Sequence, residues 1–101
     1  VLEFVPIRSY PGESSAELVL PWRPQSPSLP TLKSAELYPL TVFLEGTSVS
    51  EGRGTAAPFE LIGAPWLDGA RLAEMLNERL EGLHAEPARF TPTASKHRDT
   101  N

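Results

Sequence analysis

The chain contains no cysteine, which excludes disulfide bonds and thiolate metal sites. It has two histidines, His84 and His97, and neither has a partner at metal-ligand spacing, so we expect neither a metal site nor a cofactor. No apolar run reaches the roughly 18 residues that a membrane-spanning helix needs. The formal net charge of -4 argues against a nucleic acid or an anionic membrane surface as a partner.

Proline, by contrast, is abundant. The 101 residues include 11 prolines, about twice the usual share. Proline stands at every third position from Pro21 to Pro30, a spacing that predicts a polyproline-like crossing over the surface. The length allows one small domain at most. Because the chain opens inside an apolar run and closes on polar residues, we expect an excerpt of a longer protein.

The order of elements predicts an α/β fold. Short apolar runs predict strands at residues 1–7, 40–44, 59–62 and 87–91, and residues 18–20 fit either a short strand or a buried loop. Thr31 is placed to cap a short helix over residues 32–37, which Pro39 should end because the residue before a proline avoids the helical region. Alternation of strands with helices is typical of α/β proteins.

A second helix is predicted after Asp68, which can cap its first turn. Gly82 is placed to end this helix. Helical spacing brings five apolar residues to one face, so we expect a stripe that packs in the core rather than a cofactor site: Leu72, Met75, Leu76, Leu80 and Leu83.

A polar loop after the predicted strand at residues 40–44 holds the candidate site. It begins with Glu45 and contains Arg53, three glycines and four hydroxyl side chains. Glycines admit a close approach of the backbone to a ligand, and an arginine offers a rigid fork to an anion. Glu45 stands where the buried strand would open, and partial burial there would suit general acid catalysis. The alternatives are a loop without a ligand, and a carboxylate that only accepts hydrogen bonds from the next turn.

The loop and the segments after it read EGTSVSEGRGT at residues 45–55, then PFE at 58–60 and GAPWLD at 63–68. These segments resemble the NamZ-type exo-β-N-acetylmuramidase family. SPSLPT at 26–31 and FTPT at 90–93, followed by Ser95 and Lys96, also fit. The family usually has asparagine where this chain has Ser28 and Ser48, which puts any ligand contact by those amides in doubt.

The resemblance implies a bacterial, usually exported enzyme that releases N-acetylmuramic acid from the non-reducing end of peptidoglycan fragments. It implies a Rossmann-like α/β domain joined to a smaller α/β domain, with the site between them. Residues 1–60 would end the first domain and residues 61–101 would begin the second. The partner would be a peptidoglycan-derived muramic-acid saccharide, and the location periplasmic or extracellular.

Glycoside hydrolysis normally uses two carboxyl groups. Glu45 is the candidate catalytic residue, and the second carboxyl group is either Glu51 or lies outside this chain. Arg53 is the candidate ligand of the lactyl carboxylate of the substrate. The full set of candidate substrate-binding residues is Thr47, Ser48, Ser50, Glu51, Arg53 and Thr55. The competing hypotheses are a non-catalytic module that binds an anionic sugar or phosphate at this loop, and a purely structural segment.

Overall fold

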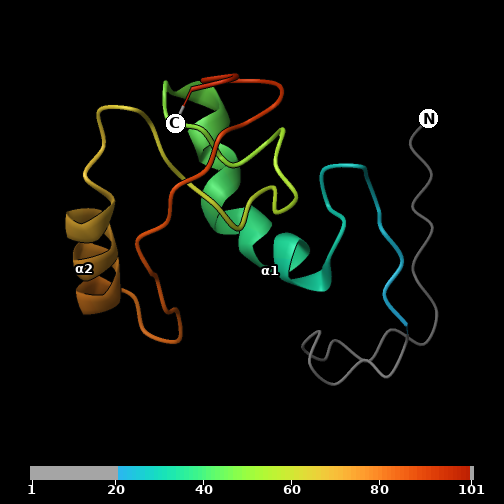
Figure 1. Ribbon diagram of the computed structural model, residues 1–101. Helices are drawn as coiled ribbons and strands as arrows, with labels where there is room; N and C mark the ends of the chain where they lie inside the picture. Colours follow the sequence, from blue (N-terminus) through green and yellow to red (C-terminus); the bar gives the residue numbers. More distant parts are fainter. Residues whose placement is uncertain (1–20, 101) are drawn as a thin grey trace, which may run out of the picture.

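The computed structural model describes residues 21–100, which form a small unit with two α-helices (Figure 1). The elements are α1 (Leu32–Thr41), the 3₁₀ helix η2 (Val42–Gly46) and α2 (Gly69–Arg79). Helix α1 and η2 follow one another through the middle of the unit, and α2 stands to one side. The strands predicted at residues 1–7 and 18–20 lie outside the described residues.

Helix α1 begins as predicted but extends further. Thr31 is its N-cap, and the Thr31 side chain accepts a hydrogen bond from the Ser34 backbone N–H. The prediction that Pro39 ends the helix is wrong, because Pro39 lies inside α1. A proline removes one helical N–H and costs stability, so tertiary contacts must hold this turn. The hydroxyl of Thr41 supplies one such contact, because its single proton is shared between the carbonyl of Leu37 within the helix and the distant carbonyl of Phe59.

The three strands predicted within the described residues are absent. Residues 40–44 complete α1 and begin η2. Residues 59–62 form a turn followed by an irregular stretch, and residues 87–91 have no regular secondary structure. Across residues 21–100 the pairing consists of two isolated antiparallel bridges, Ser26 with Leu29 and Ser50 with Gly63. The predicted Rossmann-like α/β architecture is therefore not seen in this part of the chain.

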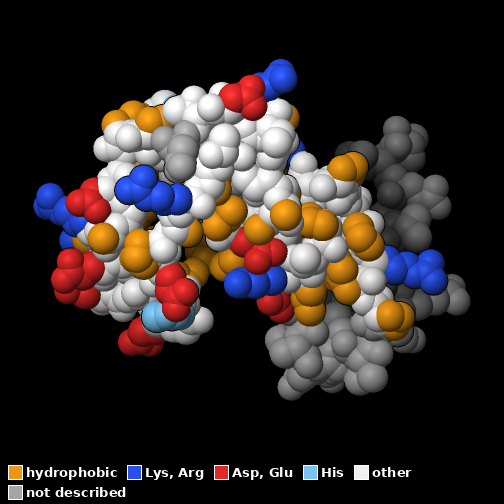
Figure 2. Space-filling model, viewed as in Figure 1, with side chains coloured by type: hydrophobic (Ala, Val, Ile, Leu, Met, Phe, Trp, Pro, Cys, Tyr) orange, Lys and Arg blue, Asp and Glu red, His pale blue; other side chains and the backbone are white. Residues whose placement is uncertain are grey.

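Helix α2 has the predicted N-cap. The carboxylate of Asp68 accepts hydrogen bonds from the backbone N–H groups of Ala70 and Arg71, both at 3.1 Å. The helix ends at Arg79, and Gly82 adopts a left-handed φ of 75° just beyond it. The apolar stripe is not a core here, since Met75 and Leu80 are 38% and 39% exposed. Figure 2 shows hydrophobic side chains lying on the surface of the molecule.

The centre of the unit is unusually polar. The fully buried side chains include Phe59, Glu51, Ser50 and Ser34. Phe59 has a φ of 65°, a conformation that bulky side chains rarely adopt. Its backbone N–H donates to the carbonyl of Glu51 at 2.7 Å, and its ring packs edge-on against Tyr38 at 4.9 Å. These contacts hold the backbone where the loop after η2 closes on α1. No helix among residues 21–100 is long and apolar enough to cross a membrane.

Candidate functional site

Glu45 and Arg53 form an ion pair across the loop that follows α1. Glu45 lies in η2 rather than at a strand end, and its side chain is 40% exposed, so the premise of a half-buried strand end is wrong. The Nε of Arg53 donates to Glu45 Oε1 at 3.1 Å, and its Nη2 donates to the same oxygen. The pair joins the start of the loop to its far end and leaves both side chains within reach of solvent.

Arg53 is held from three further sides. Its Nη1 donates to Ser28 Oγ at 2.7 Å, and its Nε lies 3.3 Å from Glu51 Oε1. The guanidinium carbon stands 5.1 Å from the centre of the Phe59 ring, a cation–π arrangement. Ser28 therefore contacts the candidate site through Arg53. The hydrogen bonds leave one N–H on Nη1 and one on Nη2 for another acceptor.

Glu51 is a buried carboxylate with two cationic partners. Its side chain is 2% exposed, and Oε2 accepts a hydrogen bond from Lys96 Nζ at 2.9 Å. The other oxygen faces Arg53. A buried carboxylate is tolerated when it is paired in this way. Glu45, Arg53, Glu51 and Lys96 thus form a chain of alternating charges, which we call the charge chain.

The hydroxyl groups of the loop mostly shape its turns. Thr47 Oγ1 donates to the Leu44 carbonyl at 2.9 Å, and Thr55 Oγ1 donates to the Gly52 carbonyl at 2.7 Å. Ser50 is 2% exposed, and its Oγ accepts from a backbone N–H of the same loop. The side chain of Ser48 is exposed. The structure therefore brings Glu45, Glu51 and Arg53 together, and gives the hydroxyls of Thr47, Ser50 and Thr55 partners within the loop.

Sequence reasoning missed the contribution of residues far along the chain. Lys96 and His97 lie in the polar segment that closes the chain, and both contact the loop. His97 Nε2 lies 2.7 Å from the Ser48 carbonyl, and because a carbonyl can only accept, this nitrogen carries the proton. No spacing rule relates these residues to the loop, which lies more than 40 positions earlier. The one available signal was the resemblance at Ser95 and Lys96.

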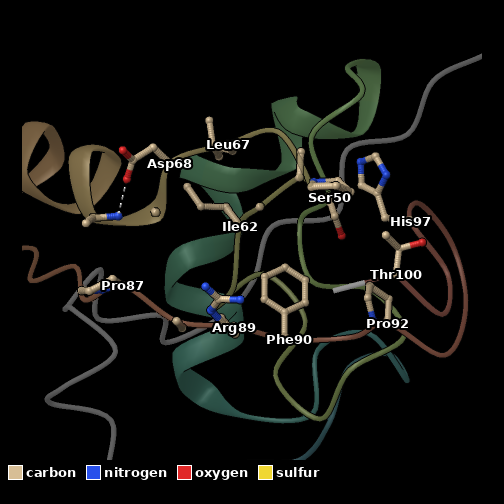
Figure 3. A pocket seen from close by; sticks show the side chains of 16 residues that line it. Ser50, Ile62, Leu67, Asp68, Pro87, Arg89, Phe90, Pro92, His97 and Thr100 are labelled. Atoms are coloured by element: carbon tan, nitrogen blue, oxygen red, sulfur yellow. Dashed lines mark hydrogen bonds between the residues drawn. The ribbon is translucent and has the colours of Figure 1, made fainter.

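A cavity of about 490 Å³ lies beside the loop and meets it at Ser50. Figure 3 shows Ser50 and His97 at one end of it, Asp68 at the other, and Phe90 along its wall. Glu45 and Arg53 do not line it. Its lining is mixed, with prolines and Phe90 beside a few polar groups.

A second ionic cluster lies at the start of α1. Glu60 Oε1 accepts hydrogen bonds from the hydroxyls of Thr31 and Ser34, and Glu60 Oε2 lies 3.7 Å from Lys33 Nζ. Burial by itself would raise the pKa of Glu60, but these hydrogen bonds and the charge of Lys33 outweigh it and hold the pKa below its usual value. Among the described residues, no group of three or more His, Asp or Glu side chains is arranged to hold a metal ion.

Known proteins are similar to this chain over the residues that form the candidate site. The family model for the C-terminal part of exo-β-N-acetylmuramidase NamZ matches residues 36–101, which include the whole charge chain. Over 82 residues the chain is 51% identical to the peptidoglycan β-N-acetylmuramidase NamZ of Bacillus subtilis (strain 168). The match covers 80% of this chain and 20% of that protein, so the chain spans about a fifth of the length of its relative. No solved structure is significantly similar. The chain belongs to the NamZ exo-β-N-acetylmuramidase family.

Proposed function

We propose that this chain is part of an exo-β-N-acetylmuramidase, a glycosidase that releases N-acetylmuramic acid from the non-reducing end of peptidoglycan fragments. The observation that carries the proposal is the match over residues 36–101, because it contains every member of the charge chain. The B. subtilis relative is a peptidoglycan β-N-acetylmuramidase.

The exposed end of the charge chain is the part suited to a substrate. Glu45 and Arg53 are 40% and 37% exposed, whereas Glu51 is 2% exposed. Arg53 retains N–H groups for a further acceptor, and a carboxylate is the acceptor that its planar fork suits best. The lactyl carboxylate of a muramic sugar is such a group. We propose that Arg53 binds it while remaining paired to Glu45.

Glu45 is the carboxylate that can reach a glycosidic bond from this chain. It is solvent-accessible and is held on one side by Arg53, so its other oxygen is open to a ligand. Glu51 is enclosed and fully paired, which favours a role inside the loop over contact with substrate. The second carboxyl group that glycosidases use would then come from another part of the longer protein.

The larger setting is also a proposal. We infer that the longer protein joins a Rossmann-like α/β domain to a smaller α/β domain. The smaller domain would begin well before residue 61, because the C-terminal family model already matches from residue 36. The site would lie between the two domains. We further propose that the protein is exported, because its peptidoglycan substrate lies outside the cytoplasmic membrane.

The test is release of free muramic sugar by the longer protein that contains this chain. A chromogenic β-N-acetylmuramide should be cleaved, and the matching N-acetylglucosaminide should be cleaved much less. The runner-up function, a module that only binds an anionic sugar, predicts binding without turnover. No cleavage and no binding would leave this loop as a structural element.

A further inference from the structure

The segment of residues 92–97 crosses the loop that carries Glu45 and Arg53. Thr93 donates to the Gly54 carbonyl from its backbone N–H at 2.8 Å and from its hydroxyl at 2.9 Å. His97 donates to the Ser48 carbonyl at 2.7 Å. In Figure 1 this segment, drawn in red, returns towards η2 and the loop after it. The loop is therefore fixed from outside by residues some 40 to 50 positions later in the chain.

Lys96 is the centre of this contact. Its Nζ donates to the carbonyl of Leu44 at 2.7 Å, to the carbonyl of Val49 at 3.0 Å and to Glu51 Oε2 at 2.9 Å. A lysine ammonium has three N–H donors, and each has an acceptor here. Leu44 precedes Glu45 and Val49 follows it, so Lys96 holds together the two ends of the segment of residues 44–49.

The backbone around Lys96 is held in a conformation that non-glycine residues rarely adopt. Ser95 has a φ of 68° and His97 a φ of 54°, one on each side of Lys96. Left-handed backbone is sterically unfavourable for a residue that carries a Cβ. Strain of this kind persists where the surrounding structure requires it, often at functional sites. Here it accompanies a lysine that is turned in towards the loop.

The contact continues to the exposed end of the charge chain. Lys96 binds one oxygen of Glu51, which leaves the other oxygen facing Arg53 at 3.3 Å. Arg53 in turn binds Glu45. Without Lys96, the buried carboxylate of Glu51 would have Arg53 as its single cationic partner and would draw the guanidinium inward, away from Glu45.

We propose that Lys96 is a positioning residue of the muramidase site, which it sets through Glu51 so that Arg53 and Glu45 meet the substrate in the right place. This inference rests on the proposed function and adds a residue with no substrate contact of its own. The competing explanation is that Lys96 only stabilises the fold. The two explanations differ in whether folded protein without Lys96 keeps its turnover.

The experiment uses the longer protein with three single variants. Lys96→Met keeps most of the side-chain volume and removes the charge. Lys96→Arg keeps the charge towards Glu51 but cannot reproduce three donors on one nitrogen. Lys33→Met is the matched control, because Lys33 also pairs with a glutamate, Glu60, but lies at the start of α1, away from the loop.

We expect kcat of Lys96→Met to fall roughly 10- to 100-fold per folded molecule, since a shift of about 1 Å at a reacting group can cost this much. KM should change by less than about threefold if Arg53 keeps contact with the substrate. Lys96→Arg should recover part of kcat, and Lys33→Met should stay within about threefold of the parent. A folded Lys96→Met protein with the parent kcat would overturn the inference.

Two further measurements keep the outcome decisive. If Lys96→Met does not fold, the double variant Lys96→Met/Glu51→Gln leaves no unpaired buried charge and should fold, since loss of both partners of a buried pair is tolerated better than loss of one. Its kcat should remain low, and recovery to within about threefold of the parent would sink the proposal.

Amide hydrogen exchange at residues 47–53 gives a readout without turnover. Exchange there should accelerate in Lys96→Met but not in Lys33→Met, even if the parent protein proves not to be a muramidase.

Discussion

Thr31 and Glu60, 29 positions apart, are joined by a hydrogen bond of 2.6 Å from the threonine hydroxyl to the carboxylate. Thr31 is at the same time the N-cap of α1, so the carboxylate of Glu60 sits at the positive end of that helix. Ser34, which is fully buried, donates to the same oxygen at 2.9 Å. One carboxylate thus ties the start of α1 to the segment that leaves the candidate site.

This cluster predicts an acid-sensitive contribution to stability. The pKa of Glu60 is lowered in the folded protein, so its contribution is present above the ordinary glutamate pKa and is lost as the pH falls through the folded value. We expect Glu60→Gln to lower the melting temperature near pH 7. The difference from the parent should shrink below about pH 4. Thermal unfolding of both proteins from about pH 7 to about pH 3 checks this, and a gap that widens on acidification would contradict it.

Glu45→Gln tests the catalytic role. The substitution keeps the shape of the side chain and removes its ionisable group. In the longer protein we expect kcat on a chromogenic muramide to fall at least about a hundredfold, the lower end for general acid–base catalysis. Glu78→Gln, on the exposed surface of α2, is the matched control and should change nothing. A loss of less than threefold at Glu45 would move the catalytic role elsewhere.

Arg53→Ala separates substrate recognition from support of the loop. Because Arg53 also holds Glu45, some loss is expected on any substrate. If Arg53 binds the lactyl carboxylate, the loss of kcat/KM should be ten- to a hundredfold greater on the muramide than on the N-acetylglucosaminide. This ratio corresponds to the roughly 1.5–3 kcal/mol of a charged hydrogen-bonded pair. Arg53→Lys should recover part of this loss. An equal loss on both substrates would assign Arg53 to the scaffold.

Gly54→Ala tests the contact between the loop and the segment of residues 92–97. Gly54 has a φ of 81°, and a Cβ there would lie 2.5 Å from the Ala94 carbonyl oxygen. The backbone conformation alone should cost about 1–2 kcal/mol, and the clash adds to it. Gly69→Ala is the control, since its Cβ would meet nothing within 4 Å and alanine favours a helix. Thermal unfolding should show a clear loss for Gly54→Ala and none for Gly69→Ala.

The sequence predicted correctly the features that depend on neighbouring residues, namely the N-caps of the two α-helices. Thr31 and Asp68 cap helices as expected, because a cap depends on residues within three positions of it. Residues 40–44 were predicted to form a strand but complete α1 and begin η2. A short apolar run fits a strand or a buried helix equally well, and Pro39 favours an end of the helix before this run. Contacts of Thr41 and Tyr38 with the distant Phe59 outweigh that preference.

In the candidate site, too, contacts within one segment could be predicted and contacts between distant segments could not. The pairing of Arg53 with a carboxylate eight positions away could be anticipated from one loop. The burial of Glu51 and its bond to Lys96 could not, since they depend on chain segments 45 positions apart. The catalytic and binding roles of the loop residues stay predictions.

The polar centre of this unit has a thermodynamic consequence. Apart from prolines, Phe59 and Ala73 are the buried hydrophobic side chains among the described residues, while Phe43 and Trp66 are 79% and 64% exposed. The heat-capacity increment of unfolding comes mainly from newly hydrated apolar surface. A unit held by ion pairs and hydrogen bonds should therefore have an increment per residue below the usual value of about 12–15 cal/mol/K. The curve of its free energy of unfolding against temperature would then be less bent than usual.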